Sequence, residues 1–132
     1  MPYQMSEPRE PDLVLEALKL RLRRFAAERD WDQFHSPKNL AMALIAEAAE
    51  LVEHFQWLTQ EESANLPPEK LGEVELELAD ILIYTVRLAD KLGIDLTEAA
   101  DKKFALNEQK YPAEQVRGSA RKHTDYREKE TS

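Results

Sequence analysis

Two pairs of carboxylates, each with a spacing of three residues, are the side chains in this sequence best suited to do chemistry. Glu47 and Glu50 form one pair, and Glu77 and Asp80 form the other. On an α-helix, residues i and i+3 project from one face on adjacent turns, so each pair would present its carboxylates together. Four carboxylates that converged between packed helices would repel one another unless a cation neutralised them. A hard divalent ion such as Mg²⁺ or Mn²⁺ binds oxygen ligands of this kind.

The surroundings of the two pairs distinguish them from ordinary surface acids. The segments LIAEAAEL and LELADILIY are otherwise almost wholly apolar, and no Lys or Arg lies three or four residues from any of the four acids. Residues 47–80 hold ten acidic residues and one basic residue, Lys70. Such a local acidic excess either lies on a solvated surface or binds cations, and the apolar context favours cations. A di-iron site is a second metal alternative, but it normally uses E-x-x-H motifs, and His54 lies four residues after Glu50.

Aromatic and basic residues elsewhere in the chain could bind a nucleotide. Four aromatic side chains could line a pocket for a nucleotide base: Trp31, His35, Trp57 and Tyr84. Stacking of the base on such rings would contribute to the free energy of binding. Isolated Trp and Tyr residues also often anchor helix packing, so a core role stays open for them. Three polar residues share helical spacing near the end of the chain: Lys103, Asn107 and Lys110. They could meet phosphates or form a solvated helix face.

Helices must position these residues, and the hydropathy pattern of the sequence predicts four helices. Apolar residues recur with helical spacing over 12–30, 37–58, 69–92 and 96–110. Local signals mark their ends: Asp12, Ser36 with Pro37, and Asp95 with Glu98 as N-terminal caps, and Gly93 as the residue after a C-terminus. Thr59 and Glu62 have capping-box spacing, with room for a turn or two before Pro67 and Pro68. No strand pattern of useful length is present, so we predict an all-α four-helix bundle.

Composition limits the remaining possibilities. The 132 residues fit one domain, which we place at 12–112 between a lead-in (1–11) and a polar tail (113–132). The chain has no cysteine and three glycines, which excludes a thiolate metal site and a glycine-rich phosphate loop. The net charge of −8 argues against a nucleic-acid partner. No apolar run approaches membrane-spanning length and the N-terminus lacks a signal-peptide pattern, so we predict a cytoplasmic protein without a membrane partner.

The order of several short motifs resembles a known family. They are WDQFH (31–35), PKNL (37–40), AEAAEL (46–51), FQW (55–57), ELADILIY (77–84), K-x-x-x-N (103–107) and KYP (110–112). This set is similar to the all-α nucleoside triphosphate pyrophosphohydrolases of the MazG-like superfamily, and is closest to its dCTP pyrophosphatase group. The resemblance extends from about Leu18 to Lys122.

The resemblance implies a specific activity and site. Members hydrolyse a nucleoside triphosphate, here dCTP or a modified cytosine nucleotide, to the monophosphate and pyrophosphate with Mg²⁺. Separately, apolar stripes on both sides of the carboxylate face predict a homo-oligomer, either a dimer or a tetramer. Metal ligands and catalytic residues would be Glu47, Glu50, Glu77 and Asp80. Substrate contacts would come from Trp31, Asp32, Gln33, Phe34, His35, Trp57 and Tyr84, with Lys103 and Asn107 near the phosphates.

This chain departs from the family pattern at two positions. Ala46 stands where superfamily members often have a Glu before the first metal ligand, which leaves the water-activating group open. Leu22 stands about where near relatives have a His on the first helix. An alternative of a different class is a non-catalytic helical dimerisation module whose acidic face is only solvated. A rise in melting temperature with Mg²⁺ would distinguish the enzyme from this module.

Overall fold

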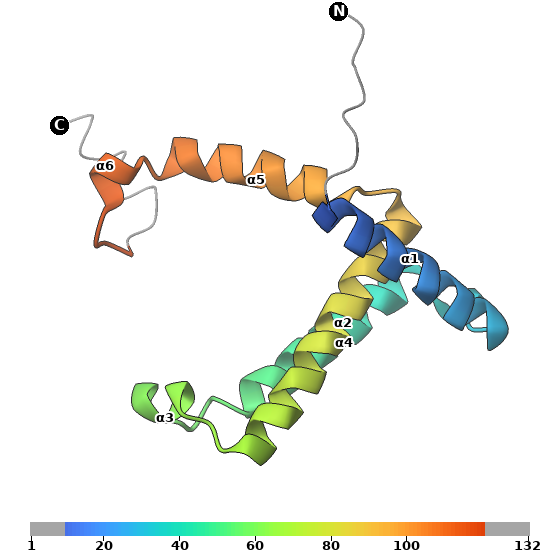
Figure 1. Cartoon of the computed structure of the whole chain (residues 1–132), viewed down its shortest axis with the longest axis horizontal. Coiled ribbons are helices and arrows are strands. Elements are labelled where there is room, and N and C mark those ends of the chain that lie inside the picture. The colour runs from blue at the N-terminus through green and yellow to red at the C-terminus, as the bar shows by residue number, and fades with distance from the viewer. Residues whose placement is uncertain (1–9, 121–132) are drawn as a thin grey trace, which may run out of the picture. The chain divides into compact units, whose positions relative to one another are not determined.

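The computed structural model describes residues 10–120, and over this range every regular element is helical (Figure 1). The elements are α1 (Glu10–Glu28), the 3-10 helix η1 (Asp32–Phe34), α2 (Pro37–Glu53), α3 (Gln60–Ala64), α4 (Pro68–Leu92), α5 (Leu96–Lys110) and α6 (Ala113–Val116). The predicted all-α class is therefore confirmed, and the predicted helix over 96–110 matches α5. The chain divides into two compact units, residues 1–94 and 95–132.

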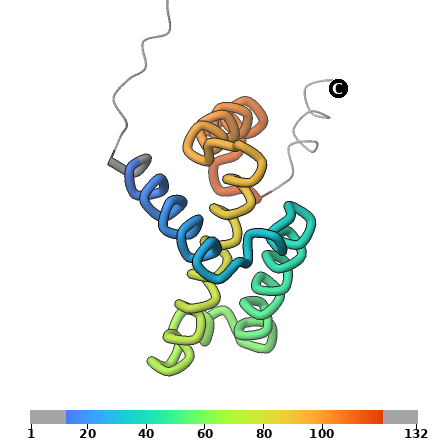
Figure 2. Tube along the Cα trace, turned by 90° about the vertical axis from the view of Figure 1, so that its right-hand side faces the viewer, coloured from blue at the N-terminus to red at the C-terminus, as the bar shows by residue number. Residues whose placement is uncertain are grey.

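In the first unit, α2 and α4 pack along each other with opposite directions, and α3 lies in the connection between them (Figures 1 and 2). α1 packs on α4 and on η1. Five apolar side chains are buried in this unit: Ala26, Leu40, Val74, Val86 and Ala89. Leu40, with 2% of its surface exposed, begins the predicted apolar stripe of α2. The antiparallel pairing brings the middle of α2 next to the middle of α4.

Helix α1 begins and ends differently from the prediction. It begins at Glu10 rather than after Asp12, because Pro11 has no N–H to lose in the first turn and its fixed φ suits a helix start. It ends at Glu28, and Asp30 then adopts a left-handed φ of 54°. The N–H of Trp31 donates to the carbonyl of Ala26 at 2.9 Å, and that of Asp30 to Ala27, which is a Schellman ending. This ending sets the direction in which the segment 31–35 leaves α1.

The prediction that the second helix runs to Leu58 was wrong, since α2 ends at Glu53. Beyond it the backbone tightens into i→i−3 bonds, as in Phe55 to Val52 at 2.9 Å and Leu58 to Phe55 at 2.9 Å. Tightened turns keep nearly the same side-chain spacing as an α-helix, so the apolar pattern alone does not distinguish them. Trp57 consequently lies in a turn rather than on a helix.

The predicted caps are confirmed at four helix ends. The Ser36 side chain accepts from the N–H of Asn39, and Asp95 accepts from Glu98. Thr59 and Glu62 form both bonds of a capping box that opens α3. Gly93 has a left-handed φ of 67°, and the N–H of Ile94 donates to Ala89 at 2.8 Å. Local chemistry therefore sets these boundaries without help from packing.

The predicted apolar seam of the helix over 69–92 is buried only in part. Val74 is buried, but Leu71 and Leu78 are more than half exposed. The buried face moves to Val86 and Ala89 in the last turns of α4, the helix on which α1 packs. The first unit therefore leaves a large apolar surface uncovered.

The predicted domain bounds stay predictions. Residues 10 and 11, placed in the lead-in, belong to α1, and the predicted tail includes the short helix α6. The rest of the lead-in and the end of the tail lie outside residues 10–120. Over the described range, no helix has both the length and the apolar character that crossing a membrane requires.

Candidate metal and nucleotide site

Three carboxylates from two helices meet where α2 and α4 pack together. One oxygen each of Glu47, Glu77 and Asp80 lie within 4.8 Å of one another. Within the described part of the chain, no other group of three His, Cys, Asp or Glu residues satisfies this criterion. Glu50, the fourth predicted ligand, is exposed on the next turn of α2, and its carboxylate hydrogen-bonds to Glu47. The structure thus brings Glu47 of the first predicted pair together with both members of the second, while Glu50 lies beside Glu47.

The electrostatics of this cluster are those of crowded like charges. A hydrogen bond with Glu77, which requires one of the two carboxyls to be protonated, raises the pKa of Glu47 to about 7. Desolvation adds to this rise, and so do the hydrogen bond and charge of Glu50 and the charge of Asp80. Near pH 7 Glu47 is therefore protonated about half of the time, in a place where a cation would relieve the same repulsion.

The chemistry of the donor set fits a divalent cation. Glu77 Oε2 is buried and has no hydrogen-bond partner among the described residues. A buried carboxylate oxygen without a donor is costly, and a metal ion would satisfy it. All the donors are carboxylate oxygens, which suit Mg²⁺ or Mn²⁺ better than softer metals. The structure therefore contains a possible acidic metal site.

His54, which the sequence analysis considered as a ligand of a di-iron site, contacts other side chains in the structure. His54 Nδ1 lies 3.0 Å from Lys70 Nζ and 3.7 Å from Glu73 Oε2. Its Nε2 is 3.8 Å from Glu77 Oε1, outside hydrogen-bond distance. Lys70 is always a donor, so His54 accepts at Nδ1 and that nitrogen is occupied. This arrangement does not favour a di-iron site. The sequence had already singled out Lys70 as the one basic residue among the ten acidic residues of 47–80.

The segment 31–35, whose five residues were predicted to contact substrate, is tied to neighbouring helices. Asp32 Oδ1 accepts from Arg87 at 2.6 Å and from Lys91 at 2.5 Å, and bonding to Lys91 is the largest effect that lowers the pKa of Asp32. His35 Nδ1 accepts from Arg87 Nε at 3.2 Å. The segment therefore rests on the last turns of α4. The sequence analysis assigned no role to Arg87, although it shares a helix stripe with Glu77 and Asp80, or to Lys91, because an i, i+4 pair of bases on a helix is normally exposed.

The other members of this segment have mainly local contacts. Gln33 Nε2 donates to the carbonyl and the carboxylate of Asp30, each at 3.0 Å. The carbonyl of Phe34 accepts from Asn39 Nδ2 at 3.0 Å, while its ring is exposed. Trp31 is half-exposed and meets the Phe25 ring edge-on at 5.7 Å. Two aromatic rings therefore remain available for a ligand on this segment.

The remaining predicted contacts lie in three places. Tyr84 is half-buried on α4 one turn after Asp80, and its pKa is raised by burial and by the nearby charges of Glu47 and Asp80. Trp57 is 86% exposed, so its alternative role as a core anchor of this chain was wrong. Lys103 and Asn107 lie on α5 in the second unit, one turn apart. Their substrate roles stay predictions.

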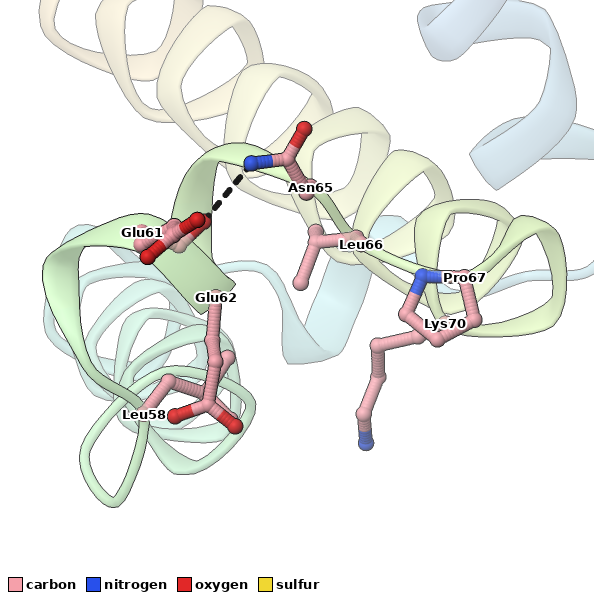
Figure 3. A pocket seen from close by; sticks show the side chains of 7 residues that line it. All are labelled: Leu58, Glu61, Glu62, Asn65, Leu66, Pro67 and Lys70. Atoms are coloured by element: carbon pink, nitrogen blue, oxygen red, sulfur yellow. Dashed lines mark hydrogen bonds between the residues drawn. The ribbon is translucent and has the colours of Figure 1, made fainter.

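A pocket of about 630 Å³ lies elsewhere, at the connection between α3 and α4 (Figure 3). It is lined by Leu58, Glu61, Glu62, Asn65, Leu66, Pro67 and Lys70. None of these was predicted to bind substrate or metal. Two of its polar groups are engaged in local structure, Glu62 in the α3 capping box and Asn65 with the carbonyl of Glu61. The pocket therefore shares no residue with the carboxylate cluster.

Comparisons with known proteins show what this chain is similar to. Residues 43–126 match the model of the MazG-like family, a range that includes all four predicted metal ligands. The mouse protein named dCTP pyrophosphatase 1 is 44% identical over 117 residues, which cover 87% of this chain and 69% of the mouse protein. The bovine dCTP pyrophosphatase 1 is 48% identical over 103 residues, which cover 76% of this chain and 61% of the bovine protein.

A solved structure extends the likeness to the fold. The crystal structure of a pyrophosphatase from Archaeoglobus fulgidus aligns with a TM-score of 0.69 and 38% identity, covering 83% of this chain and 99% of that one. Together with the curated relatives, it confirms the prediction of a nucleotide pyrophosphohydrolase. Both the family match and the identity to relatives extend over most of the sequence. The chain belongs to the MazG-like family.

Proposed function

We propose that this nucleotide pyrophosphohydrolase hydrolyses dCTP, or a modified cytosine nucleotide, to the monophosphate and pyrophosphate in a Mg²⁺-dependent reaction. The observation that carries the proposal is the convergence of Glu47, Glu77 and Asp80 within 4.8 Å between α2 and α4. The choice of nucleotide comes from the relatives named dCTP pyrophosphatases. A role in removing unwanted nucleotides from the pool follows from that chemistry.

The carboxylates would hold the metal, with Glu50 as the fourth ligand. A bound Mg²⁺ would neutralise charge on the phosphates and lower the pKa of a water molecule. Because the ligands project from two packed helices, their positions are set before substrate arrives. Glu47 would give up the proton it shares with Glu77 when the metal binds. With Ala46 in place of an acid, a carboxylate of the cluster itself would accept a proton from water.

The nucleotide contacts would come from the segment 31–35 and from two further rings. Trp31, Phe34 and Trp57 offer exposed aromatic faces for stacking. Tyr84 sits near the carboxylates and would contact the sugar or base. Lys103 and Asn107 would approach the phosphates. We place the reaction in the cytoplasm and expect no nucleic-acid polymer as a substrate.

Self-association belongs to the same proposal. Large apolar side chains on α2 and α4 are exposed, including Ile45 at 67% and Leu76 at 69%. No helix of the described range could span a membrane. Exposed apolar surface spread over two helices indicates a protein–protein interface. We propose a homo-oligomer, either a dimer or a tetramer.

A nucleotide panel with detection of pyrophosphate tests the proposal. We expect dCTP to be among the best substrates with Mg²⁺, and turnover to stop when EDTA is added. Thermal melts of the same preparation with and without Mg²⁺ give a second readout, because ions bound to the folded state alone raise the melting temperature. Absence of turnover on every nucleotide, together with no effect of Mg²⁺ on melting, would favour the non-catalytic helical module.

A further inference from the structure

The charged side chain of Arg87 is buried, with 6% of its surface exposed. A buried guanidinium is costly unless its donors are paired. Here they are paired on three sides: Arg87 donates to Asp32 at 2.6 Å and to His35 at 3.2 Å, and its NH1 lies 3.5 Å from Asp90 Oδ2. The first two partners belong to the segment 31–35 and the third belongs to α4.

A second arginine supports the network from α1. Arg23 donates to both oxygens of Asp90, from Nε at 2.7 Å and from NH2 at 2.5 Å. The Asp90 side chain is 8% exposed, and its pKa is lowered, chiefly by the hydrogen bond from Arg23. Arg23 thus keeps Asp90 ionised and in place beside Arg87. The pairs connect α1, α4 and the segment 31–35.

The segment 31–35 contains one short turn of regular structure and a few local hydrogen bonds. Its regular part, η1, is three residues long; no side-chain bond caps its N-terminus, and Asn39 Nδ2 donates to the carbonyl of Phe34 at its C-terminal end. One turn of 3-10 helix has poor hydrogen-bond geometry and does not persist alone. The contacts from Arg87 and Lys91 to Asp32, and from Arg87 to His35, connect this short turn to α4 and hold it in place.

The contact with Arg87 also determines the protonation of His35. A guanidinium N–H can only donate, so His35 Nδ1 must accept and cannot carry a proton. The remaining ring proton is then on Nε2, and the ring is neutral. Burial, and next the charges of Arg87 and Lys91, lower the pKa of His35, while Asp32 opposes the shift. The neutral form is therefore the stable one at pH 7.

We propose that Arg87 is a positioning residue that holds the segment 31–35 on α4 and keeps His35 as the neutral Nε2–H tautomer, so that the segment presents a fixed donor to the nucleotide. Its consequence for catalysis rests on the proposed function, because that function makes the segment a nucleotide contact. Arg87 would act through the segment and not on the phosphates.

Nitrogen-15 NMR of the histidine rings tests the tautomer in the wild-type protein without substrate. The chain has three histidines, and His54→Gln and His123→Gln variants assign their signals. We expect His35 at pH 7 to show an unprotonated Nδ1 and a protonated Nε2. In Arg87→Met we expect a mixture of tautomers. A wild-type His35 that is protonated on Nδ1 would overturn the proposal, whether or not the variant folds.

Kinetics on dCTP test the positioning role. We expect Arg87→Met to raise KM by about ten-fold or more, with a smaller change in kcat and the same rise in melting temperature with Mg²⁺. Arg87→Lys should not restore KM, because an ammonium lacks the planar set of donors that reaches Asp32 and His35 together. Arg24→Met, an exposed arginine on α1, is the matched control and should leave KM unchanged.

The outcomes separate this proposal from the proposed function. Active wild-type enzyme with unchanged KM in Arg87→Met would refute the positioning role and leave the function standing.

If Arg87→Met does not fold, Asp32→Asn takes its place, because it removes one anchor and leaves the buried arginine paired with Asp90. A raised KM in Asp32→Asn supports the proposal, and an unchanged KM refutes it. A wild-type protein that hydrolyses no nucleotide, yet shows the Nε2–H tautomer, would refute the function alone.

Discussion

At the residue scale, the carboxylate cluster is a property of position as much as of residue type. Of the ten acids in residues 47–80, Glu47, Glu77 and Asp80 converge, because they lie on the facing sides of two packed helices. Glu75 lies on the same α4 but is exposed and belongs to no such group. The contrast between Glu75 and Glu77 provides a matched control.

Neutral replacements of the four predicted ligands should abolish turnover. Glu47→Gln, Glu50→Gln, Glu77→Gln and Asp80→Asn each remove a charge that would hold the metal, and we expect kcat to fall by at least about 100-fold. Helix content measured by circular dichroism should not change. Glu75→Gln should retain wild-type activity. Near-wild-type rates in any two of the four variants would contradict the metal site.

The shared proton of Glu47 predicts an unusual pH dependence of stability. The pKa of Glu47 is about 7 in the folded chain and 4.5 for a free side chain. Between these values the folded state binds more protons than the unfolded state, so stability without metal should fall as the pH rises from about 5 to 8. Thermal melts in EDTA measure this fall. Glu47→Gln should reduce it, and Mg²⁺ should oppose it at pH 8. A metal-free melting temperature that rises across this range would contradict the assignment.

At the element scale, the early end of α2 decides the role of Trp57. Had the helix continued to Leu58, Trp57 would have kept a helical position beside the apolar stripe. The tightened turn after Glu53 instead leaves this ring 86% exposed. A large exposed indole contributes little to the stability of the chain that carries it, and is available to a ligand.

Removal of Trp57 should therefore affect binding more than folding. We expect Trp57→Ala to raise KM for dCTP by roughly 5-fold to 100-fold, the range for loss of one stacked base, with little change in melting temperature. Trp31→Ala is the comparison, because Trp31 also contacts Phe25 and should lower the melting temperature as well. Kinetics and thermal melts on the same preparations measure both effects. A sharply destabilised Trp57→Ala with normal KM would contradict this prediction.

At the scale of the whole molecule, the described fold buries few large apolar side chains. Five apolar residues are buried, two of them alanines, while eighteen large hydrophobic residues are exposed. Apolar surface of that extent is better explained by an interface than by solvent exposure. The predicted seam of α4, with Leu71 and Leu78 uncovered, is part of this surface.

We expect the working unit to be larger than a monomer. Light scattering at micromolar concentration should give a mass of at least twice the 15.3 kDa of the chain. Ile45→Lys places a charge on the exposed apolar face of α2 and should shift the protein toward smaller species with lower activity. Lys38→Glu, an exposed charge change on the same helix, should leave the mass unchanged. A fully active wild-type monomer would contradict the proposal.

The sequence by itself determined the features that depend on local chemistry. The caps at Ser36, Thr59 and Asp95, the glycine ending at Gly93 and the all-α class follow from hydrogen bonds and periodicity within a few residues. The two acid pairs were also identifiable: a single pair of this spacing is common, but two pairs in apolar helix centres without basic neighbours are unusual.

The tertiary structure alone decided which partners those residues meet. Nothing near Arg87 in sequence indicates that its charge is buried, since its partners Asp32 and His35 lie more than 50 residues away. The sequence also did not indicate that α2 ends at Glu53, because the apolar residues keep helical spacing through the tightened turn that follows. Convergence of Glu47 with Glu77 and Asp80 required α2 and α4 to pack in one register. Long-range pairing of this kind depends on how helix faces fit together, which the order of residues along one helix does not specify.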